Sequence, residues 1–409
     1  MSVKSLILLA LLVSSASASD WPQLLGPTRD AVYAGPPLAT AWPKEGPPIL
    51  WSAKVGEGYS NPVTSEGRVV IAHRIGNNLV VDSLDAKTGT NQWRFEHPMV
   101  FQDGAGFDNG PRATPAITDG RVFVQNADGY FACLDLKTGK QLWSHEVKTE
   151  FGSSATWFGC VSSPLVTEKA VFLLVGSTNA GVVALAPATG EVQWKALGEK
   201  ATASTPVLAT LDGKPQLMVV TRSALHGLDP ATGKEYWHYP MRRQTSGEVY
   251  AANPVVFGDQ VFLSGWYKLG ALLLRVKEDK AEKVWHLDDA VSTHYATSLI
   301  LDGYAYGYHG HAWESGGPQL RCVEVATGKV MWEGEKNGSG TVIRFGDHLL
   351  ILSDRGELML AKASPKEFKV TSRFQAVGRT TRNYPALADG FAYIKGPRKL
   401  VCLDLRAAK

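Results

Sequence analysis

The chain has 409 residues, of which 44% are hydrophobic and 20% are charged, so it can bury a large core and is not globally disordered. Lys and Arg number 42 and Asp and Glu number 39, a formal net charge of +3. No Lys- or Arg-rich run is present, and this balance excludes a general nucleic-acid-binding protein. The 41 glycines, 22 prolines and 12 tryptophans indicate many turns and short strands rather than long helices.

Residues 1–18 have the pattern of a secretory signal peptide. Lys4 is positively charged, residues 6–13 form an apolar run too short to span a bilayer, and residues 16–18 (Ala-Ser-Ala) match the small-x-small cleavage pattern. We expect a mature chain that begins at Ser19. Because no Cys follows the apolar run, lipid attachment at a new N-terminus is not expected. The sequence thus predicts a soluble exported protein, periplasmic or secreted, with no transmembrane segment.

A repeat runs through the rest of the chain. Tryptophans recur at intervals of 42–51 residues, at Trp51, Trp93, Trp143, Trp194, Trp237, Trp285 and Trp332. Five of them follow a Thr-Gly dipeptide in the frame TG-x-x-x-W, and an apolar strand pair precedes that turn. Further upstream, most repeats carry a small or polar residue followed by Pro, as in Thr114-Pro115. Glycine takes positive φ without steric cost, so Thr-Gly is a natural turn between two strands.

Each repeat therefore holds four antiparallel strands in about 45 residues, which is the size of a propeller blade. Seven blades are expected to begin near Ser60, Ala113, Ser162, Ser204, Ala252, Ala296 and Gly340. The three strands of residues 383–405 complete an eighth blade with the strand at residues 48–51. This blade, shared between the N- and C-terminal ends, closes the ring and leaves no free sheet edge. Residues 19–409 are thus predicted to form one all-β domain, an eight-bladed β-propeller.

Two blades depart from the repeat. Blade 5 has Glu278-Asp279-Lys280 in place of Thr-Gly, and blade 7 lacks both the turn and its tryptophan, for which Phe374 is the candidate substitute.

The cysteines fit the same repeat. The position before the Leu-Asp-like pair is mostly small around the ring: Ser83, Cys133, Ala184, Gly227, Arg275, Cys322, Ala361 and Cys402. Its three cysteines belong to blades that are not neighbours, so no disulfide is expected among them. Cys160 lies in a loop and is the one candidate for a reactive thiol.

The...LD-x-x-TG-x-x-x-W repeat resembles the tryptophan-docking motif of the quinoprotein-dehydrogenase-like eight-bladed propellers, also called PQQ-like repeat proteins. The resemblance covers nearly the whole mature chain, and residues 20–30 (DWPQLLGPTRD) resemble the start of secreted bacterial proteins of this kind. It implies the fold. It does not by itself imply an activity, because the fold hosts both enzymes and non-enzymes.

Two branches of that family imply different functions. In one, alcohol dehydrogenases hold pyrroloquinoline quinone (PQQ) and Ca²⁺ and commonly have an adjacent Cys-Cys pair. This chain has no adjacent cysteines and no haem-attachment C-x-x-C-H. In the other, short propellers act as scaffolds in outer-membrane barrel assembly. Those match this chain in size and compartment, although they are usually lipoproteins.

The candidate binding surface lies where the loops between blades meet the axis. Aromatic, arginine and amide side chains in these loops could hold a planar anion, contact a protein partner, or simply pack the axial channel. The candidate residues are Tyr59, Asn61, Asp108, Arg112, Trp157, Tyr250, His294, Arg379 and Arg382.

Other constellations are weak. His309 and His311 have strand-like spacing near Glu314, but a loop of blade 6 is favoured over a metal site, and no metal is expected. The favoured function is a monomeric, non-catalytic binding or assembly scaffold with a protein or small-ligand partner and no cofactor. The alternative is a PQQ- and calcium-dependent dehydrogenase with an atypical axial site. A third hypothesis is a carbohydrate-active enzyme that uses the same axial surface.

Overall fold

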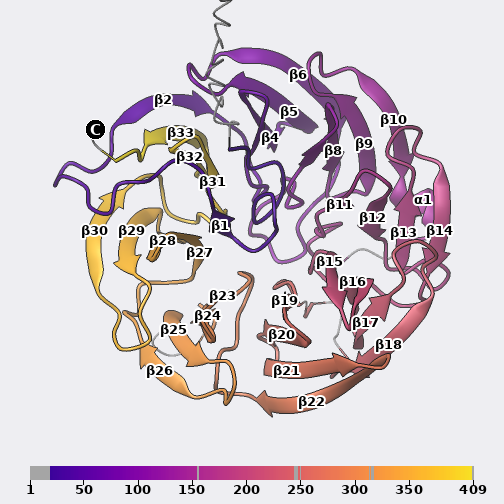
Figure 1. Ribbon diagram of the computed structural model, residues 1–409. Helices are drawn as coiled ribbons and strands as arrows, with labels where there is room; N and C mark the ends of the chain where they lie inside the picture. Colours follow the sequence, from indigo (N-terminus) through magenta and orange to yellow (C-terminus); the bar gives the residue numbers. More distant parts are fainter. Residues whose placement is uncertain are drawn as a thin grey trace, which may run out of the picture.

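The computed structural model describes residues 19–153, 156–243, 247–248, 250–312, 314 and 317–407. Across these residues the fold is all-β except for one short helix, α1 (Val147–Phe151). Eight sheets stand around a common axis as the blades of a propeller (Figure 1), which confirms the predicted fold. The predicted signal peptide lies outside the described residues. No helix in the described segments is long and apolar enough to cross a membrane.

Blades 1 to 4 each contain four antiparallel strands, and they follow one another along the chain. From the axis outward, blade 1 has β3 (Val63–Ser65), β4 (Arg68–Ile75), β5 (Asn78–Asp85) and β6 (Asn91–Pro98); blade 2 has β7 (Ala116–Thr118), β8 (Arg121–Gln125), β9 (Tyr130–Asp135) and β10 (Gln141–Glu146); blade 3 has β11 (Leu165–Val166), β12 (Val171–Leu174), β13 (Val182–Leu185) and β14 (Val192–Ala196); blade 4 has β15 (Val207–Leu211), β16 (Lys214–Val220), β17 (Ala224–Leu228) and β18 (Glu235–Pro240).

Blades 5 to 8 continue the ring, and blade 8 takes its outermost strand from the N-terminal part of the chain. Blade 5 has β19 (Val255–Phe257), β20 (Gln260–Gly265), β21 (Gly270–Lys277) and β22 (Lys280–Leu287); blade 6 has β23 (Leu299–Leu301), β24 (Tyr304–His309), β25 (Gln319–Glu324) and β26 (Val330–Glu333); blade 7 has β27 (Gly340–Phe345), β28 (His348–Ser353), β29 (Glu357–Lys362) and β30 (Val370–Gln375); blade 8 has β31 (Ala386–Ala388), β32 (Phe391–Lys395), β33 (Lys399–Asp404) and β2 (Ile49–Lys54).

The closing blade forms as predicted. β2 pairs antiparallel with β33, and Trp51 lies opposite Cys402. One strand was not expected: β1 (Val32–Tyr33) pairs parallel with the innermost strand of blade 7, so that blade has five strands. The N-terminal part of the chain therefore joins the ring at two places.

The repeat tryptophans connect neighbouring blades. In six of them the indole Nε1 donates a hydrogen bond to a backbone carbonyl that follows the Leu-Asp-like pair of the next blade, as Trp93 does to Leu136 at 2.8 Å and Trp285 to Val325 at 2.9 Å. The other four bonds are Trp51 to Ala86, Trp143 to Pro187, Trp194 to Pro230 and Trp332 to Ser364. The Thr-Gly turn makes room for the ring: a Cβ on Gly139 would lie 2.6 Å from the indole of Trp93.

Trp237 is the exception, and its neighbour explains it. Trp237 belongs to blade 4, and the next blade, blade 5, lacks the Thr-Gly turn against which the other indoles pack. Its indole therefore donates to the side chain of Gln216 in its own blade, at 2.7 Å.

The register corrects two details of the repeat. In blade 5 the residue opposite the tryptophan, Trp285, is Leu273 rather than Arg275. In blade 7 a bulge places Ser372 at the tryptophan position. The residue opposite that position is therefore Leu360, and not Ala361 as the repeat predicted. Phe374 is therefore not the substitute. It lies two residues further along the same strand face and packs against Gly46, whose Cβ would fall 2.0 Å from its ring.

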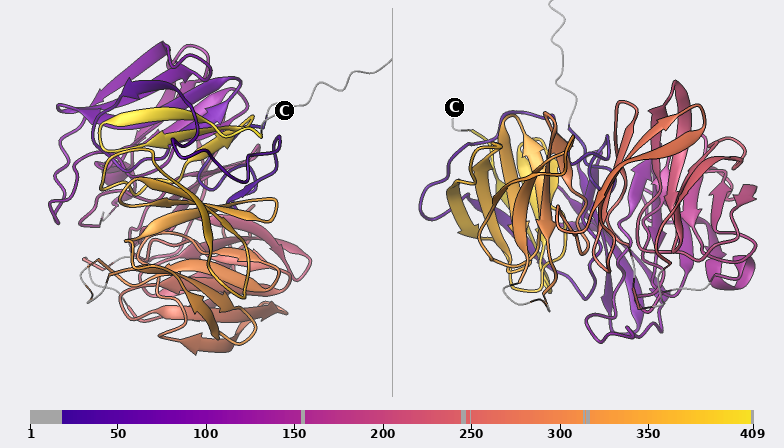
Figure 2. Two further views of the ribbon diagram at one scale, coloured as in Figure 1. Left: turned by 90° about the vertical axis from the view of Figure 1, so that its left-hand side faces the viewer. Right: turned by 90° about the horizontal axis from the view of Figure 1, so that it is seen from below.

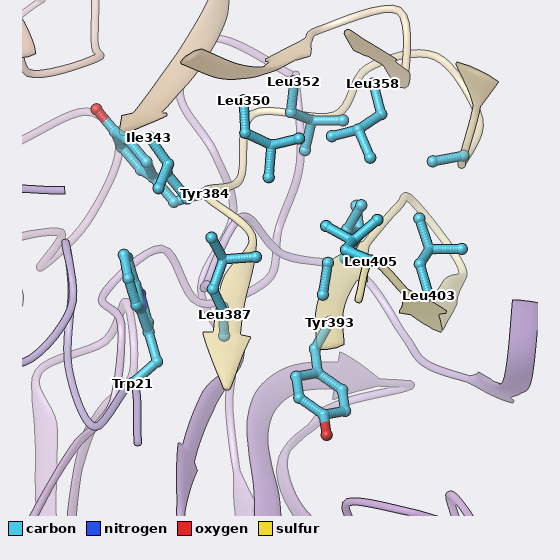
Figure 3. Packing of buried hydrophobic residues seen from close by; sticks show 14 of the residues in the cluster. Trp21, Ile343, Leu350, Leu352, Leu358, Tyr384, Leu387, Tyr393, Leu403 and Leu405 are labelled. Atoms are coloured by element: carbon cyan, nitrogen blue, oxygen red, sulfur yellow. The ribbon is translucent and has the colours of Figure 1, made fainter. Parts of the chain in front are cut away.

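The N-terminal segment, residues 20–38, crosses the centre of the ring and binds several blades (Figure 1). Thr64 of blade 1 donates its backbone N–H to the Trp21 carbonyl, and Ile117 of blade 2 donates to the Pro22 carbonyl. Trp21 is buried among leucines and tyrosines of blades 7 and 8 (Figure 3). The segment thus lies on the axis of the ring, and its Leu24 lines the axial cavity described below.

All four cysteines lie within the described residues, and each is free and buried. Burial raises the pKa of the Cys160 thiol, which disfavours the thiolate form that reactivity requires.

Candidate functional site

A cavity of about 170 Å³ opens on the axis at the face made by the loops that lead from the outer strand of one blade to the inner strand of the next. Loops of the first blades project from the body of the disc (Figure 2, right). Leu24 of the N-terminal segment lies at its inner end. The remaining lining residues are Tyr59, Asn61, Arg112, Thr114, Phe158, Val161, Ser163, Ala203, Thr205, Ala251, Asn253, His294, Tyr295, Thr297, Arg382 and Tyr384.

The wall of the cavity is a belt of hydrogen bonds between blades. Side-chain oxygens of the small or polar residues before the inner strands accept backbone N–H groups of the preceding blade, as Ser163 Oγ accepts from Thr114 at 2.8 Å. The same pattern joins Ser163 to Thr205, Thr205 to Asn253, Asn253 to Thr297, and Tyr384 to Asn61. The recurring small-residue-Pro pairs were the signal for this belt in the sequence, but their role as inter-blade hydrogen-bonding groups was missed.

Arg112 is fixed in place at the cavity mouth. Its guanidinium donates to the Asp103 carboxylate at 2.8 Å and to the carbonyls of Phe158 and Asp108 at 3.0 and 3.1 Å. The Asp103 carboxylate is buried and also accepts N–H groups of its own loop. Arg112 thus ties two loops together, and most of its hydrogen-bonding capacity is used within the protein.

Arg382 is placed differently. Its guanidinium carbon lies 5.0–5.8 Å from the ring centroids of Tyr59, Phe107 and Tyr295. It lines both the axial cavity and an adjoining groove that includes Asp108 and Thr380. Within the described parts of the chain, no hydrogen bond or ion pair of its guanidinium is found.

His294 and His311 form a buried pair beside this cavity. Their Nε2 atoms lie 3.1 Å apart, so one ring donates to the other. Burial, together with His311 and Arg382, holds the pKa of His294 well below its ordinary value, and the pair is neutral at pH 7. Glu314 accepts from the His311 backbone and from the Trp266 indole, so its carboxylate caps a loop. His309 accepts a backbone N–H from Ser292 and is not part of the pair.

Five of the nine predicted surface residues line the axial cavity: Tyr59, Asn61, Arg112, His294 and Arg382. Asp108 lines the adjoining groove. Trp157 lies outside the cavity and is 54% exposed, and its side chain lies beside Gly104 and Gly247 of neighbouring loops.

Two residues are placed elsewhere than predicted. Tyr250 is fully buried in the core between blades 4 and 5, where its hydroxyl donates to the Arg242 carbonyl. Arg379 is exposed and lines neither cavity, because its loop turns outward before it returns to the axis at Arg382.

The donor set of the cavity does not fit a calcium–quinone centre. No carboxylate lines the axial cavity among the described residues, and the side-chain oxygens of Asn61 and Asn253 are used in the hydrogen-bond belt. Calcium is bound in proteins by several carboxylate and carbonyl oxygens, so a set of this kind provides too few ligands. No cluster of three or more His, Cys, Asp or Glu side chains suited to a metal ion occurs in the described segments.

The architecture and the site define a ring-closed PQQ-like propeller with an arginine- and aromatic-rich axial cavity. The family model described as "Outer membrane protein assembly factor BamB" matches residues 27–156 and 77–333. The outer membrane protein assembly factor BamB of Burkholderia pseudomallei is 30% identical over 322 residues, which are 76% of this chain and 74% of that protein. The chain therefore belongs to the BamB family of PQQ-like propellers.

Solved structures show the same fold. The crystal structure of BamB from Moraxella catarrhalis matches with a TM-score of 0.63 at 14% identity, over 88% of this chain and 98% of that one. Quinohemoprotein alcohol dehydrogenase from Comamonas testosteroni matches with a TM-score of 0.64 at 14% identity, over 96% of this chain and 81% of that one. At such low identity both likenesses concern the fold alone, since the fold carries unrelated functions.

Proposed function

We propose that this protein is a non-catalytic assembly factor of the cell envelope, which binds a protein partner through its axial face. Membership of the BamB family carries the proposal, because the relatives that match most of the chain are named as outer membrane protein assembly factors. The axial residues are consistent with it: arginine and aromatic side chains are the types enriched in protein-binding hot spots. Export to the periplasm and a monomeric state belong to the same proposal.

The dehydrogenase alternative has less support. A quinone enzyme needs oxygen ligands for its metal and a general base at the axis, and the lining residues of this cavity are short of both. His294 lines the cavity, but its Nε2 is hydrogen-bonded to His311. We therefore propose that the protein works without PQQ and calcium.

A gene deletion in the native host tests the proposed function. Loss of the protein is expected to lower the amounts of folded β-barrel proteins in isolated outer membranes, and a plasmid copy is expected to restore them. Unchanged outer-membrane protein levels in the deletion strain would contradict the assembly role. Reconstitution of the purified protein with PQQ and Ca²⁺ is the second arm, and stoichiometric quinone binding with dye reduction by alcohols would favour the dehydrogenase.

A further inference from the structure

Arg382 stands out among the charged groups near the axis because no hydrogen bond or ion pair of its guanidinium is found within the described chain. The carboxylate that interacts with it at longer range is Asp354, whose pKa burial raises and the Arg382 charge lowers. Arg112, the other axial arginine, has a carboxylate partner in Asp103 and two carbonyl partners. Arg382 instead faces three aromatic rings, Tyr59, Phe107 and Tyr295. Ring faces attract a cation but leave the N–H groups of the guanidinium fork without acceptors.

The groups around Arg382 restrict which ligand can accept hydrogen bonds from its guanidinium. In the adjoining groove Gly58, Gly396 and Pro397 add backbone and little side-chain bulk, and both cavities meet at the arginine. The groove also contains the Asp108 carboxylate, so an incoming acid is expected to pair with Arg382 on the side of the axial cavity, which has no carboxylate in its described lining. A planar guanidinium with free N–H groups matches a carboxylate, which accepts two parallel hydrogen bonds from it. Arg382 is partly buried among the three rings, and partial removal from water strengthens such a pairing.

Exposed apolar side chains form a rim on the loops that follow blades 1 and 2, and one of them, Phe107, lies against the arginine. Val100 is 84% exposed, Trp157 54% and Phe107 42%, and all three belong to the loops that follow blades 1 and 2. The loops contact each other, since Gly104 donates its backbone N–H to the Trp157 carbonyl at 3.1 Å. Phe107 links the rim to the cavity because Arg382 lies 5.0 Å from its ring.

We propose that the axial mouth binds an extended acidic–apolar peptide segment of a protein partner: a carboxylate pairs with Arg382, and a neighbouring apolar side chain packs on Phe107 and Trp157. The inference rests on the proposed function and specifies the chemistry of the partner. Charge complementarity carries it, since an arginine whose N–H groups have no acceptor in the described chain, close to the exposed Phe107, matches a segment that has both an acid and an apolar residue. The cavity accommodates a side chain or a chain terminus rather than a folded domain.

Random dodecapeptides displayed on phage provide the probe. They are selected on the immobilised full-length mature protein, and the dissociation constants of the enriched peptides are measured with the purified protein by fluorescence anisotropy. We expect enrichment of Asp or Glu next to an aromatic or aliphatic residue. Replacing the acid by its amide, or Arg382→Met in the protein, should each weaken binding about 10- to 100-fold. The two changes together should cost little more than either alone, because they break one interaction.

Matched variants separate the site from general charge. Arg379→Met removes an arginine from the same loop that lines neither cavity, and it should change the dissociation constant less than about twofold. Arg382→Lys keeps the charge but loses the fork, so binding should fall between wild type and Arg382→Met. Thermal unfolding of each variant, compared with that of the wild type, serves as the control that the fold is retained.

Enriched peptides without acids, or acidic peptides that bind Arg382→Met as well as wild type, would overturn the docking proposal. Neither result would contradict the assembly role, because that role is tested by the outer-membrane protein profile of the deletion strain. Conversely, a normal profile in that strain would overturn the assembly role even if peptide binding depended on Arg382.

Discussion

The backbone nitrogen of Ser19 lies 2.8 Å from Oδ1 of Asp389, and the Asp389 backbone N–H donates to Ser19 Oγ at the same distance. These two residues belong to opposite ends of the chain, and the contact fastens the start of the N-terminal segment to the first hairpin of blade 8. Ser19 is also the residue predicted to follow the signal peptidase site. Cleavage would turn its amide into a charged ammonium group facing the Asp389 carboxylate.

This relationship gives a first prediction. Mass spectrometry of protein exported by a Gram-negative host should give the mass of a chain beginning at Ser19. In that mature protein Asp389→Asn should lower the free energy of unfolding by less than about 1 kcal/mol, because the pair is exposed and screened by salt. Recovery of unprocessed chain in the membrane fraction would contradict the cleavage.

A second prediction concerns the tryptophan repeat. Trp93→Ala should lower the free energy of unfolding by about 3–5 kcal/mol, because the indole is buried between blades 1 and 2 and bonds Leu136. Trp157→Ala should cost clearly less, since that indole is mostly exposed. Chemical denaturation of both variants measures the difference. Equal losses would be incompatible with the blade packing described above.

A third prediction concerns acid stability. Burial alone would raise the pKa of Asp82, but hydrogen bonds from His73 and Arg94 lower it to about 2. The His73 ring accepts the Gly56 N–H on Nδ1, so it donates to Asp82 from Nε2. Because the pKa is depressed in the folded state, the stabilisation is present above pH 4 and is lost as pH falls toward 2.

Asp82→Asn is therefore expected to cost about 2 kcal/mol at pH 7. The difference in unfolding free energy between wild type and variant should shrink between pH 4 and pH 2. Urea titrations at several pH values provide the measurement, and a constant difference across that window would exclude this role for the carboxylate.

A fourth prediction concerns Lys395, which is fully buried in blade 8. Its ammonium donates to the carbonyls of Gly58 and Gly396, and burial lowers its pKa to about 8. Below pH 8 both folded and unfolded chains carry the proton, and the folded state bears the full cost of burying the charge. Between pH 8 and the unfolded value near 10.5 the unfolded chain binds more protons, so the stability contributed by this site rises with pH.

Lys395→Met should accordingly stabilise the protein by about 1–3 kcal/mol at pH 7, since a buried charge is replaced by an apolar group of similar length. The gain should fall as pH rises from 8 toward 10.5. Comparison of the two unfolding curves at pH 7 and pH 10 isolates Lys395 from the titrating tyrosines, which are common to both proteins. Destabilisation by the methionine at pH 7 would show that the two carbonyl contacts outweigh the burial of the charge.

The repeat predicted the blades, their order and the split closing blade, because turn chemistry and tryptophan spacing are local properties of the sequence. The pairing of β1 with β27 was not predictable. The two residues of β1 are too few to show a periodicity, and their partner strand lies in blade 7, far along the chain. Phe374 was wrongly predicted to replace the tryptophan of blade 7, because a one-residue bulge changes which side chain faces the next blade and places Ser372 there.

The axial site was predictable in part for a similar reason. The connections between blades must converge on the axis, so Tyr59, Arg112, His294 and Arg382 could be assigned to one face from blade order alone. The direction of a side chain within a long loop depends on contacts that the repeat does not encode. Tyr250 turns into the core and Arg379 turns to solvent for that reason.

The pairing of β2 with β33 also determines the order in which parts of the propeller can fold. β2 belongs to the first part of the chain to leave the ribosome or the export channel, and its partner belongs to the last. The four antiparallel strands of each of blades 1 to 7 can form from contiguous residues. The pairing of β2 with β33 can form only afterwards, and it bears the loop-closure entropy of the roughly 350 residues between them. Until then β2 and β33 are the strands with unpaired edges, and a chaperone that protects the folding chain has these two edges to cover.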